Sequence, residues 1–300
     1  MTGLQLATEA RMLIAVAPFA MGSPRSRPMK LSTHGGRTMV RTRISALQWL
    51  AATTATMLLM AATASAAAEN ETRTFEGAAV RIANGSAHTV VRTGAAGNPI
   101  SIGVVFTAGM LEGLPRAAEG ADPDFPFQLS MPEKGPKTVV DHVVINWESA
   151  GHPPPGVYDV PHFDFHFYLV SSAERLKVRF KSENESGDPS QQPPAELLPA
   201  GYIMPPGTAV SAMGVHAINP ASAEFHAQPF TATFIYGYYN KQLTFIEPMA
   251  SLAYLQSKPA FSAPIARPAR FEKRGAYPSS YRVDYDDASK SYEVSLVDLQ

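Results

Sequence analysis

The stretch Pro161-His-Phe-Asp-Phe-His-Phe-Tyr168 alternates aromatic and ionisable residues. Side chains two positions apart on a β-strand point to the same face, so this run predicts a strand with three phenylalanines on one face. The opposite face carries His162, Asp164 and His166, followed by Tyr168. A phenylalanine face is typical of a hydrophobic core, whereas three ionisable groups in alternation indicate a polar site.

Short runs of strand-forming residues lie on both sides of this stretch and are separated by glycine and proline. The 300-residue chain contains 26 prolines, and such punctuation favours an all-β fold, mainly an antiparallel barrel or sandwich with few short helices. The expected strands are 79–82, 89–92, 100–107, 125–131, 138–147, 162–170, 176–181, 202–204, 209–215, 230–238 and 242–248.

The end of the chain predicts a β-hairpin extension. Residues 281–285 and 292–297 are its strands, and the polar stretch 286–290 is its turn. The Pro- and Arg-rich stretch 258–278 is expected to link this hairpin to the main body. Helical turns are expected only at 171–175 and 251–256.

The N-terminal part has the order of a secretory signal peptide. Arg41 and Arg43 follow Met39, an apolar run covers 44–60, and Ala64-Ser-Ala66 is a small-x-small cleavage signature. We expect cleavage near Ala66 and a periplasmic or secreted protein without a stable membrane anchor, the alternative being an uncleaved anchor. Met39 is an alternative start codon to Met1. The predicted division is an extension with signal peptide at 1–66, a core domain at 67–257, and a linker with hairpin at 258–300.

The net charge and the cysteine content limit which partners and which metal ligands are expected. Seven of the 25 basic groups and one of the 26 acidic groups precede the expected cut, so the remainder holds 18 basic and 25 acidic groups, a net charge of −7. This balance argues against nucleic acid as a partner. The chain has no cysteine, so any metal has to be held by imidazole and oxygen ligands.

Candidate ligands also lie outside the central stretch. His216 follows a glycine at a strand end, Glu247 shares a strand face with apolar residues, and His152 lies in a proline-rich loop. His142 and His226 are weaker candidates, and His88 is excluded. The sequence therefore predicts a metal site with a second shell or mouth; its ligands are His162, Asp164, His166, His216 and Glu247, and its outer residues are His152 and Tyr168.

The spacing of the two central histidines sets a condition on this site. His162 and His166 lie about 13 Å apart along a flat strand, so binding one ion with both requires a bulge, strong curvature or a second copy of the chain. We nevertheless expect His162, with Asp164 or His166, to converge with His216 and Glu247 on one point. The alternative is that these residues are ordinary polar groups on a solvated face of a sheet and bind no metal. Zinc, manganese and iron suit such ligands.

The run Gly156-Val-Tyr-Asp-Val-Pro-His-Phe-Asp-Phe-His-Phe-Tyr168 resembles a family of secreted bacterial proteins of unassigned function. The prototype of that family is controlled by an extracytoplasmic-stress sigma factor. The resemblance spans Val139 to Gln256 and implies no activity. It implies a signature set made of His152, His162, Asp164, His166, His216 and Glu247. The pattern is also similar to that of the cupins, although order and spacing differ, so cupin-like chemistry is an analogy only.

Two functions remain open at this point. The first is a binding or stress-response protein that holds a metal or small ligand in the His/Asp/Glu pocket. The second is a metal-dependent enzyme, a cupin-like oxygenase or a hydrolase, with an open coordination position. The nearest candidates for a general base are Tyr168 and Glu148. A site closed by four protein ligands would count against the enzyme.

Overall fold

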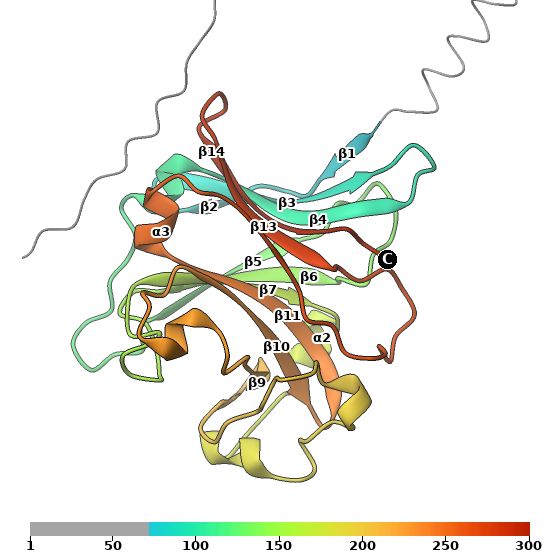
Figure 1. Ribbon diagram of the computed structural model, residues 1–300. Coiled ribbons are helices and arrows are strands. Elements are labelled where there is room, and N and C mark those ends of the chain that lie inside the picture. Colours follow the sequence, from blue (N-terminus) through green and yellow to red (C-terminus); the bar gives the residue numbers. More distant parts are fainter. Residues whose placement is uncertain (1–71) are drawn as a thin grey trace, which may run out of the picture. The chain divides into compact units, whose positions relative to one another are not determined.

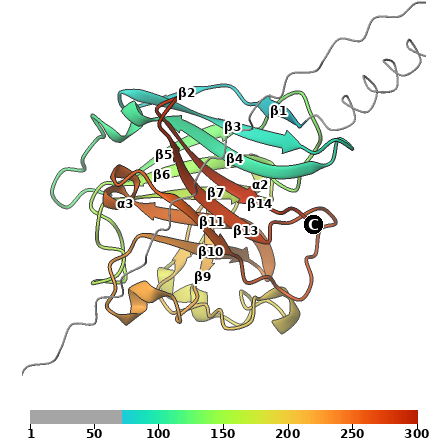
Figure 2. The same ribbon diagram turned by 45° about the horizontal axis from the view of Figure 1, so that its top comes forward.

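The computed structural model describes residues 72–300, which lie within one compact unit. They form two seven-stranded sheets whose strand pairs are antiparallel. Figures 1 and 2 show the sheets as two layers joined by short helices and loops. One of the two sheets is a half-barrel. This arrangement confirms the predicted all-β class.

The first sheet contains both ends of the described chain. Its order is β1 (Arg73–Glu76), β3 (Gly85–Thr93), β4 (Pro99–Thr107), β14 (Ser291–Val297), β13 (Ser280–Asp286) and β12 (Ala260–Pro264), and β2 (Val80–Ile82) also pairs with β3. The 3-10 helix η1 (Ala108–Leu111) follows β4. Strands from the two ends of the chain therefore meet where β14 pairs with β4.

The second sheet carries the predicted site. Its order is β5 (Asp124–Ser130), β6 (His142–Glu148), β7 (His162–Tyr168), β11 (Gln242–Ser251), β10 (Ala232–Tyr239), β9 (Gly214–Ala217) and β8 (Ala209–Val210). The central strand β7 is the stretch in which aromatic and ionisable residues alternate. It pairs with β6 through all seven residues without a register shift.

The hydrophobic core lies between the two sheets. Phe163, Phe165 and Phe167 of β7 are fully buried in it, as the alternation predicts. Phe106 of β4 stacks on Phe165 at a centroid distance of 5.9 Å and on Tyr292 of β14 at 5.1 Å. Aromatic contacts thus tie the phenylalanine face of β7 to two strands of the opposite sheet.

The other face of the second sheet is also covered. All seven residues of β7 are buried, because a long segment after α2 (Ser172–Arg175) passes over that face. Figure 1 shows this segment in yellow, on the side of the second sheet away from the first. It includes η2 (Glu183–Gly187) and η3 (Ala195–Leu197), and η4 (Ala223–His226) follows β9. The polar face is therefore enclosed rather than solvated.

Several elements agree with the sequence and others differ. The strand expected at 209–215 is interrupted by a turn at 211–213, which divides it into β8 and β9. The two helical turns are α2 and α3 (Leu252–Gln256), each started by a serine whose side chain accepts a backbone N–H. The strand predicted at 176–181 is absent. The N–H groups of residues 176–178 bond back to the carbonyls of residues 172, 174 and 175, so 176–177 form a turn, and residues 178–180 have no regular structure. Residues 202–204 make one isolated bridge. The stretch expected as a linker contains β12.

The C-terminal hairpin is present as β13 and β14, with its turn at 287–290. It does not stand apart from the sandwich, because β14 pairs with β4 through seven residue pairs. The predicted signal peptide and start codons lie outside residues 72–300. Within those residues, no helix combines the length and the apolar character needed to span a bilayer.

Candidate metal centre

The covered face of the second sheet gathers ionisable side chains from neighbouring strands. The register of β6 and β7 places Glu148 opposite His162 and Asn146 opposite Asp164. On the other side of β7, Met249 of β11 lies opposite Asp164, and Glu247 shares the face of Met249. His216 comes from β9, where it pairs with Gly237 of β10.

Three of these side chains converge around His166, and we call them the His166 group: His166, His216 and Glu247. One potential ligand atom of each lies within 4.8 Å of the others. His166 Nε2 is 3.5 Å from Glu247 Oε1, and His216 Nε2 is 3.9 Å from Glu247 Oε2. His166 Nε2 and Glu247 Oε2 are buried and have no hydrogen-bond partner.

Local packing holds the two imidazoles of the His166 group. The Thr208 carbonyl lies 3.0 Å from His216 Nδ1. Because a carbonyl can only accept a hydrogen bond, Nδ1 carries the proton in this contact, and the lone pair of Nε2 is free to bind a metal. The Phe245 ring packs edge-on against His166 at 4.7 Å and lies 5.1 Å from His216. Gly237 leaves the room for that ring, because a Cβ there would overlap it.

A second set, the His162 group, consists of His152, His162 and Asp164. Its potential ligand atoms also lie within 4.8 Å of one another. His162 Nε2 is 3.2 Å from Asp164 Oδ1, and His152 Nε2 is 3.6 Å from Asp164 Oδ2. His162 Nε2 and Asp164 Oδ1 are buried without a hydrogen-bond partner.

His152 reaches this group from the loop between β6 and β7. Gly151 precedes it with a φ of +75°, and a Cβ at that position would overlap backbone atoms of Tyr158 and Val160. Only glycine fits such a position without strain. The His152 N–H donates to the Tyr158 carbonyl at 3.1 Å. The loop therefore folds back on itself and directs the imidazole toward Asp164.

Burial dominates the electrostatics of the His166 group. It lowers the pKa of His166 to about 3 and that of His216 to about 4, so both imidazoles are neutral at pH 7. Burial also raises the pKa of Glu247 well above its usual range, with the charges of Asp164 and Glu148 adding to the effect. Neutral imidazoles are the form that ligates metals.

In the His162 group, the neighbouring side chains shift one another's pKa values against the effect of burial. Burial alone would raise the pKa of Asp164, but the neighbouring His162 and His152 hold it well below its usual range. Burial alone would lower the pKa of His152, but Asp164 raises it to about 9. In the absence of metal, a proton on His152 therefore partners the Asp164 carboxylate, and a metal has to displace that proton.

Both groups line one cavity of about 480 Å³. Its wall includes His152 and Asp164 of one group and the whole of the other. Apolar residues complete it, among them Ile218, Ile235 and Met249. The volume lies within the range of small-molecule sites.

The structure divides the predicted ligands between two groups. His166, His216 and Glu247 come together, whereas His162 and Asp164 lie with His152 around a separate point. The expected single point of convergence is not found. The reason is the straight pairing of β7, which has no bulge to bring positions 162 and 166 together. His152, expected in the second shell or at the mouth, offers a ligand atom itself.

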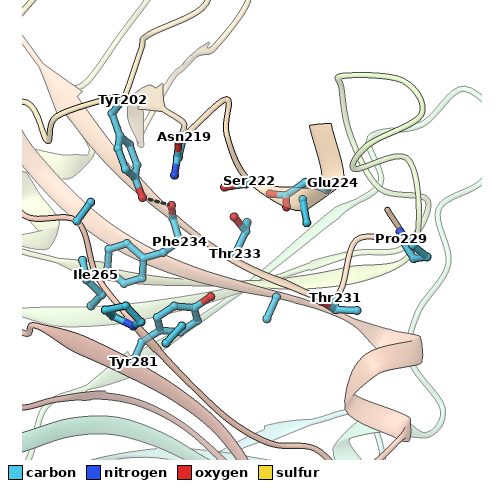
Figure 3. A pocket seen from close by; sticks show the side chains of 15 residues that line it. Tyr202, Asn219, Ser222, Glu224, Pro229, Thr231, Thr233, Phe234, Ile265 and Tyr281 are labelled. Carbon is cyan, nitrogen blue, oxygen red and sulfur yellow. Dashed lines mark hydrogen bonds between the residues drawn. The ribbon is translucent and has the colours of Figure 1, made fainter. Parts of the chain in front are cut away.

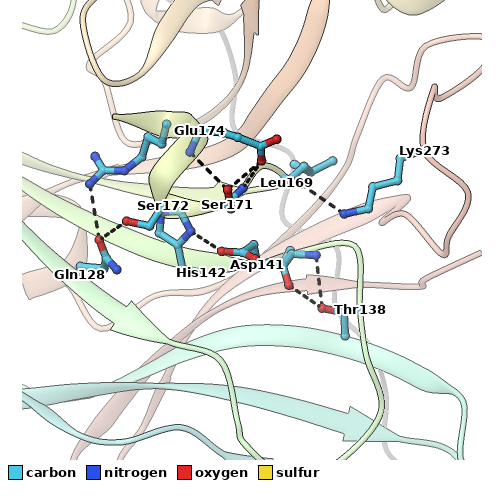
Figure 4. A network of polar contacts seen from close by, with 11 residues as sticks. Gln128, Thr138, Asp141, His142, Leu169, Ser171, Ser172, Glu174 and Lys273 are labelled. Atoms are coloured by element: carbon cyan, nitrogen blue, oxygen red, sulfur yellow. Dashed lines mark hydrogen bonds and ion pairs between the residues drawn. The ribbon is translucent and has the colours of Figure 1, made fainter. Parts of the chain in front are cut away.

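Tyr168 lies behind His166 rather than in the cavity wall. Its ring stacks on His166 at 5.7 Å and on His142 at 4.9 Å. His142 Nδ1 contacts the Asp141 carboxylate at 2.9 Å. Figure 4 shows this pair beside the capping contacts of Ser171 and Glu174 that start α2. His142 thus belongs to a supporting network beyond the cavity.

Part of the acidic wall of the cavity, Asp124, was not predicted from the sequence. Asp124 of β5 lines the cavity with Glu148, and Asn146 donates to both carboxylate oxygens of Asp124, at 2.8 and 3.0 Å. Burial raises the pKa of Asp124 to about 6 and that of Glu148 to about 8. The alternation of His142, Asn146 and Glu148 along β6 was the signal available for this face.

Another pocket, of about 460 Å³, lies next to β10 and β12 and contains none of the predicted ligands. Figure 3 shows Tyr202 at its edge, where the hydroxyl donates to the Phe234 carbonyl at 2.9 Å. Glu224 and Thr233 supply further polar groups, and Tyr281 of β13 supplies an aromatic wall. Its polar groups have no imidazole among them, so it is not a candidate for a transition metal.

The donor atoms of both groups fit a divalent transition metal. Each group offers two imidazole nitrogens and one carboxylate, a set that zinc, manganese and iron accept. The buried ligand atoms without a hydrogen-bond partner are costly unless a cation or proton satisfies them. These are therefore His/Asp/Glu groups that could hold a metal.

The fold and the site together define an antiparallel β protein with a candidate metal pocket enclosed on one sheet face. Residues 94–147 match the model of a family described as TTHB210-like, hypothetical protein TTHB210. The chain is similar to this uncharacterised family from β4 to most of β6, and the run 156–168 lies outside the matched part. No curated protein and no solved structure gave a match.

Proposed function

We propose that this chain is an exported protein that holds a divalent transition metal in the His166 group. The observation that carries the proposal is the convergence of three buried ligand atoms, from His166, His216 and Glu247, at one cavity wall. Zinc, manganese and iron are the candidate ions. The run 156–168 resembles a family of secreted bacterial proteins whose prototype is controlled by an extracytoplasmic-stress sigma factor, and this resemblance supports a role in the bacterial envelope under stress.

The full chain, produced in a bacterium, tests both parts of this proposal. We expect the protein in the periplasmic fraction or medium to begin at Ala67, by intact-mass measurement, and to carry metal by elemental analysis. His216→Ala should weaken metal binding by more than about 100-fold, because loss of outer-shell partners alone costs about 10–100-fold.

His88→Ala is the matched control, since His88 lies on β3 in the first sheet, and its metal content should equal that of the unmodified chain. An intact N-terminus on cytoplasmic protein would refute export. Equal metal retention by the His216→Ala variant and the unmodified chain would refute the His166 group as the site.

A metal-dependent enzyme is the second candidate, and one observation favours it. The His166 group offers three protein ligands beside a cavity of about 480 Å³, and three ligands with an open position are typical of catalytic rather than structural zinc. A bound metal would supply Lewis-acid chemistry there. Glu148 lines the same cavity, and because burial raises its pKa to about 8, its carboxyl holds a proton at pH 7 that it can donate. X-ray absorption of the loaded protein separates the candidates, because four protein ligands would exclude the open site.

A further inference from the structure

We propose that the cavity holds two metal ions, the second bound by the His162 group of His152, His162 and Asp164. This inference rests on the proposed function, since it assumes that the His166 group binds the first ion. It adds a second, separate centre for the same class of divalent transition metal. Both centres line one cavity.

The ligand atoms of the His162 group are directed as a metal site requires. The Val160 carbonyl lies 2.6 Å from His162 Nδ1, and the Pro153 carbonyl lies 2.7 Å from His152 Nδ1. A carbonyl can only accept, so both histidines carry their proton on Nδ1 in these contacts and turn Nε2 toward Asp164. This is how outer-shell groups commonly fix metal-binding histidines.

Buried atoms without partners are the second observation. His162 is fully buried and Asp164 is 3% exposed. His162 Nε2 and Asp164 Oδ1 nevertheless have no hydrogen-bond partner, although they lie 3.2 Å apart. Leaving such atoms unpaired costs free energy, and a cation between them would satisfy both.

One ion cannot serve both groups. His162 and His166 are four residues apart on a strand whose pairing with β6 is continuous, which places their backbones about 13 Å apart along the strand. Zinc–nitrogen bonds are only about 2.0–2.1 Å long. The potential ligand atoms accordingly form two separate groups, and each group is a candidate centre.

The charge of the cavity wall favours a second cation. Six acidic residues line it: Asp122, Asp124, Glu148, Asp164, Glu183 and Glu247. Among the lining residues, all of which belong to the described part of the chain, there is no Lys or Arg. In the metal-free protein a proton on His152 partners the Asp164 carboxylate. A second divalent ion at Asp164 would take the place of that proton.

Zinc stoichiometry tests this inference. The full chain is freed of metal with a chelator, loaded with Zn²⁺ alone, desalted and analysed for zinc per chain. We expect two zinc ions in the unmodified chain and in His88→Ala, one in His152→Ala, one in His216→Ala and none in the double variant. His152 is the residue to change because its side chain is 33% exposed on a loop, so the variant should fold.

Cobalt supplies an independent readout. With Co²⁺ in place of Zn²⁺, the visible absorption of the unmodified chain should equal the sum of the spectra of the two single variants. Circular dichroism of each variant verifies that it is folded.

The outcomes separate the two proposals. One zinc in the unmodified chain, lost in His216→Ala but kept in His152→Ala, would overturn the second centre and leave the proposed function standing. One zinc lost in both variants would mean a single shared site and would also overturn the inference. Absence of zinc from the folded unmodified chain would overturn the proposed function itself.

Discussion

At the scale of single residues, the positions of His166 and His216 depend on glycine at position 237, because any larger side chain there would overlap the Phe245 ring. Gly237 of β10 lies opposite Phe245 of β11 and opposite His216 of β9. The Phe245 ring occupies the space above Gly237 and contacts His166 and His216. Replacing this glycine would therefore affect the metal ligands without changing any of them.

We predict that Gly237→Ala destabilises the fold by about 1–3 kcal/mol, as overpacking of a core does, and weakens metal binding. The added methyl group displaces the Phe245 ring toward the two imidazoles. Denaturant unfolding and Zn²⁺ titration measure the two effects. Gly187→Ala is the matched control, because nothing lies within 4 Å of a Cβ at that position. Equal zinc affinity of the two variants would contradict this account of Phe245.

At the scale of elements, the hairpin of β13 and β14 is part of the sandwich. It supplies Tyr281, Val283, Tyr292, Val294 and Leu296 to the core between the sheets. Together with β12, it covers the phenylalanine face of the second sheet and pairs with the free side of β4. Removing it would expose that core face and leave β4 as an open edge.

A chain of residues 67–257 should therefore fail to fold. We expect it to be aggregated or to unfold without a cooperative transition, because the large core surface against β13 and β14 is lost. Circular dichroism during urea titration measures the unfolding of this chain, and a chain of residues 67–300 measured in the same way is the reference. A soluble 67–257 monomer with a sigmoidal unfolding curve would show that the hairpin is an accessory.

At the scale of the whole molecule, an acidic cavity is enclosed between a sheet and a covering segment. In the metal-free protein its groups respond to pH in opposite directions. Burial lowers the pKa of His166 to about 3 and of His216 to about 4. These two imidazoles therefore bind fewer protons in the folded state than in the unfolded chain below about pH 6.5, and their contribution to stability falls on acidification. Burial raises the pKa of Glu148 to about 8, and Asp164 raises that of His152 to about 9.

These raised pKa values predict that metal-free protein loses stability as the pH rises from about 6.5 to 8. In that range the folded state holds protons on Glu148 and His152 that the unfolded chain has released, so rising pH favours unfolding. The part due to Glu148 is on the order of 2 kcal/mol, or about 4–8 °C in Tm. Thermal unfolding in a chelator measures it.

Glu148→Gln should flatten this decline, and the exposed Glu133→Gln should leave it unchanged. A decline of the same size in the Glu148→Gln protein would contradict the assignment. Saturating Zn²⁺ should raise Tm, because a ligand that binds only the folded state stabilises it.

Local features of the chain could be predicted from the sequence. The alternation from Pro161 to Tyr168 determined a strand with an aromatic core face and a polar face, because side-chain direction on a strand depends only on a period of two. The serines that start α2 and α3, and the C-terminal hairpin, were also predictable, since capping and hairpin turns involve neighbouring residues. The ligand types followed from the absence of cysteine.

Which ligand atoms meet depends on contacts between distant parts of the chain. Glu247 faces His166 because β11 pairs with β7, and His152 reaches Asp164 because its loop folds back at Gly151. The insertion of β14 beside β4 and the turn at 176–177 are likewise set by contacts that no local pattern encodes. The two faces of β7 follow from the alternation of its residues alone. The division of the polar face into two groups came from strand pairing, because continuous pairing with β6 keeps the backbones of His162 and His166 about 13 Å apart along the strand.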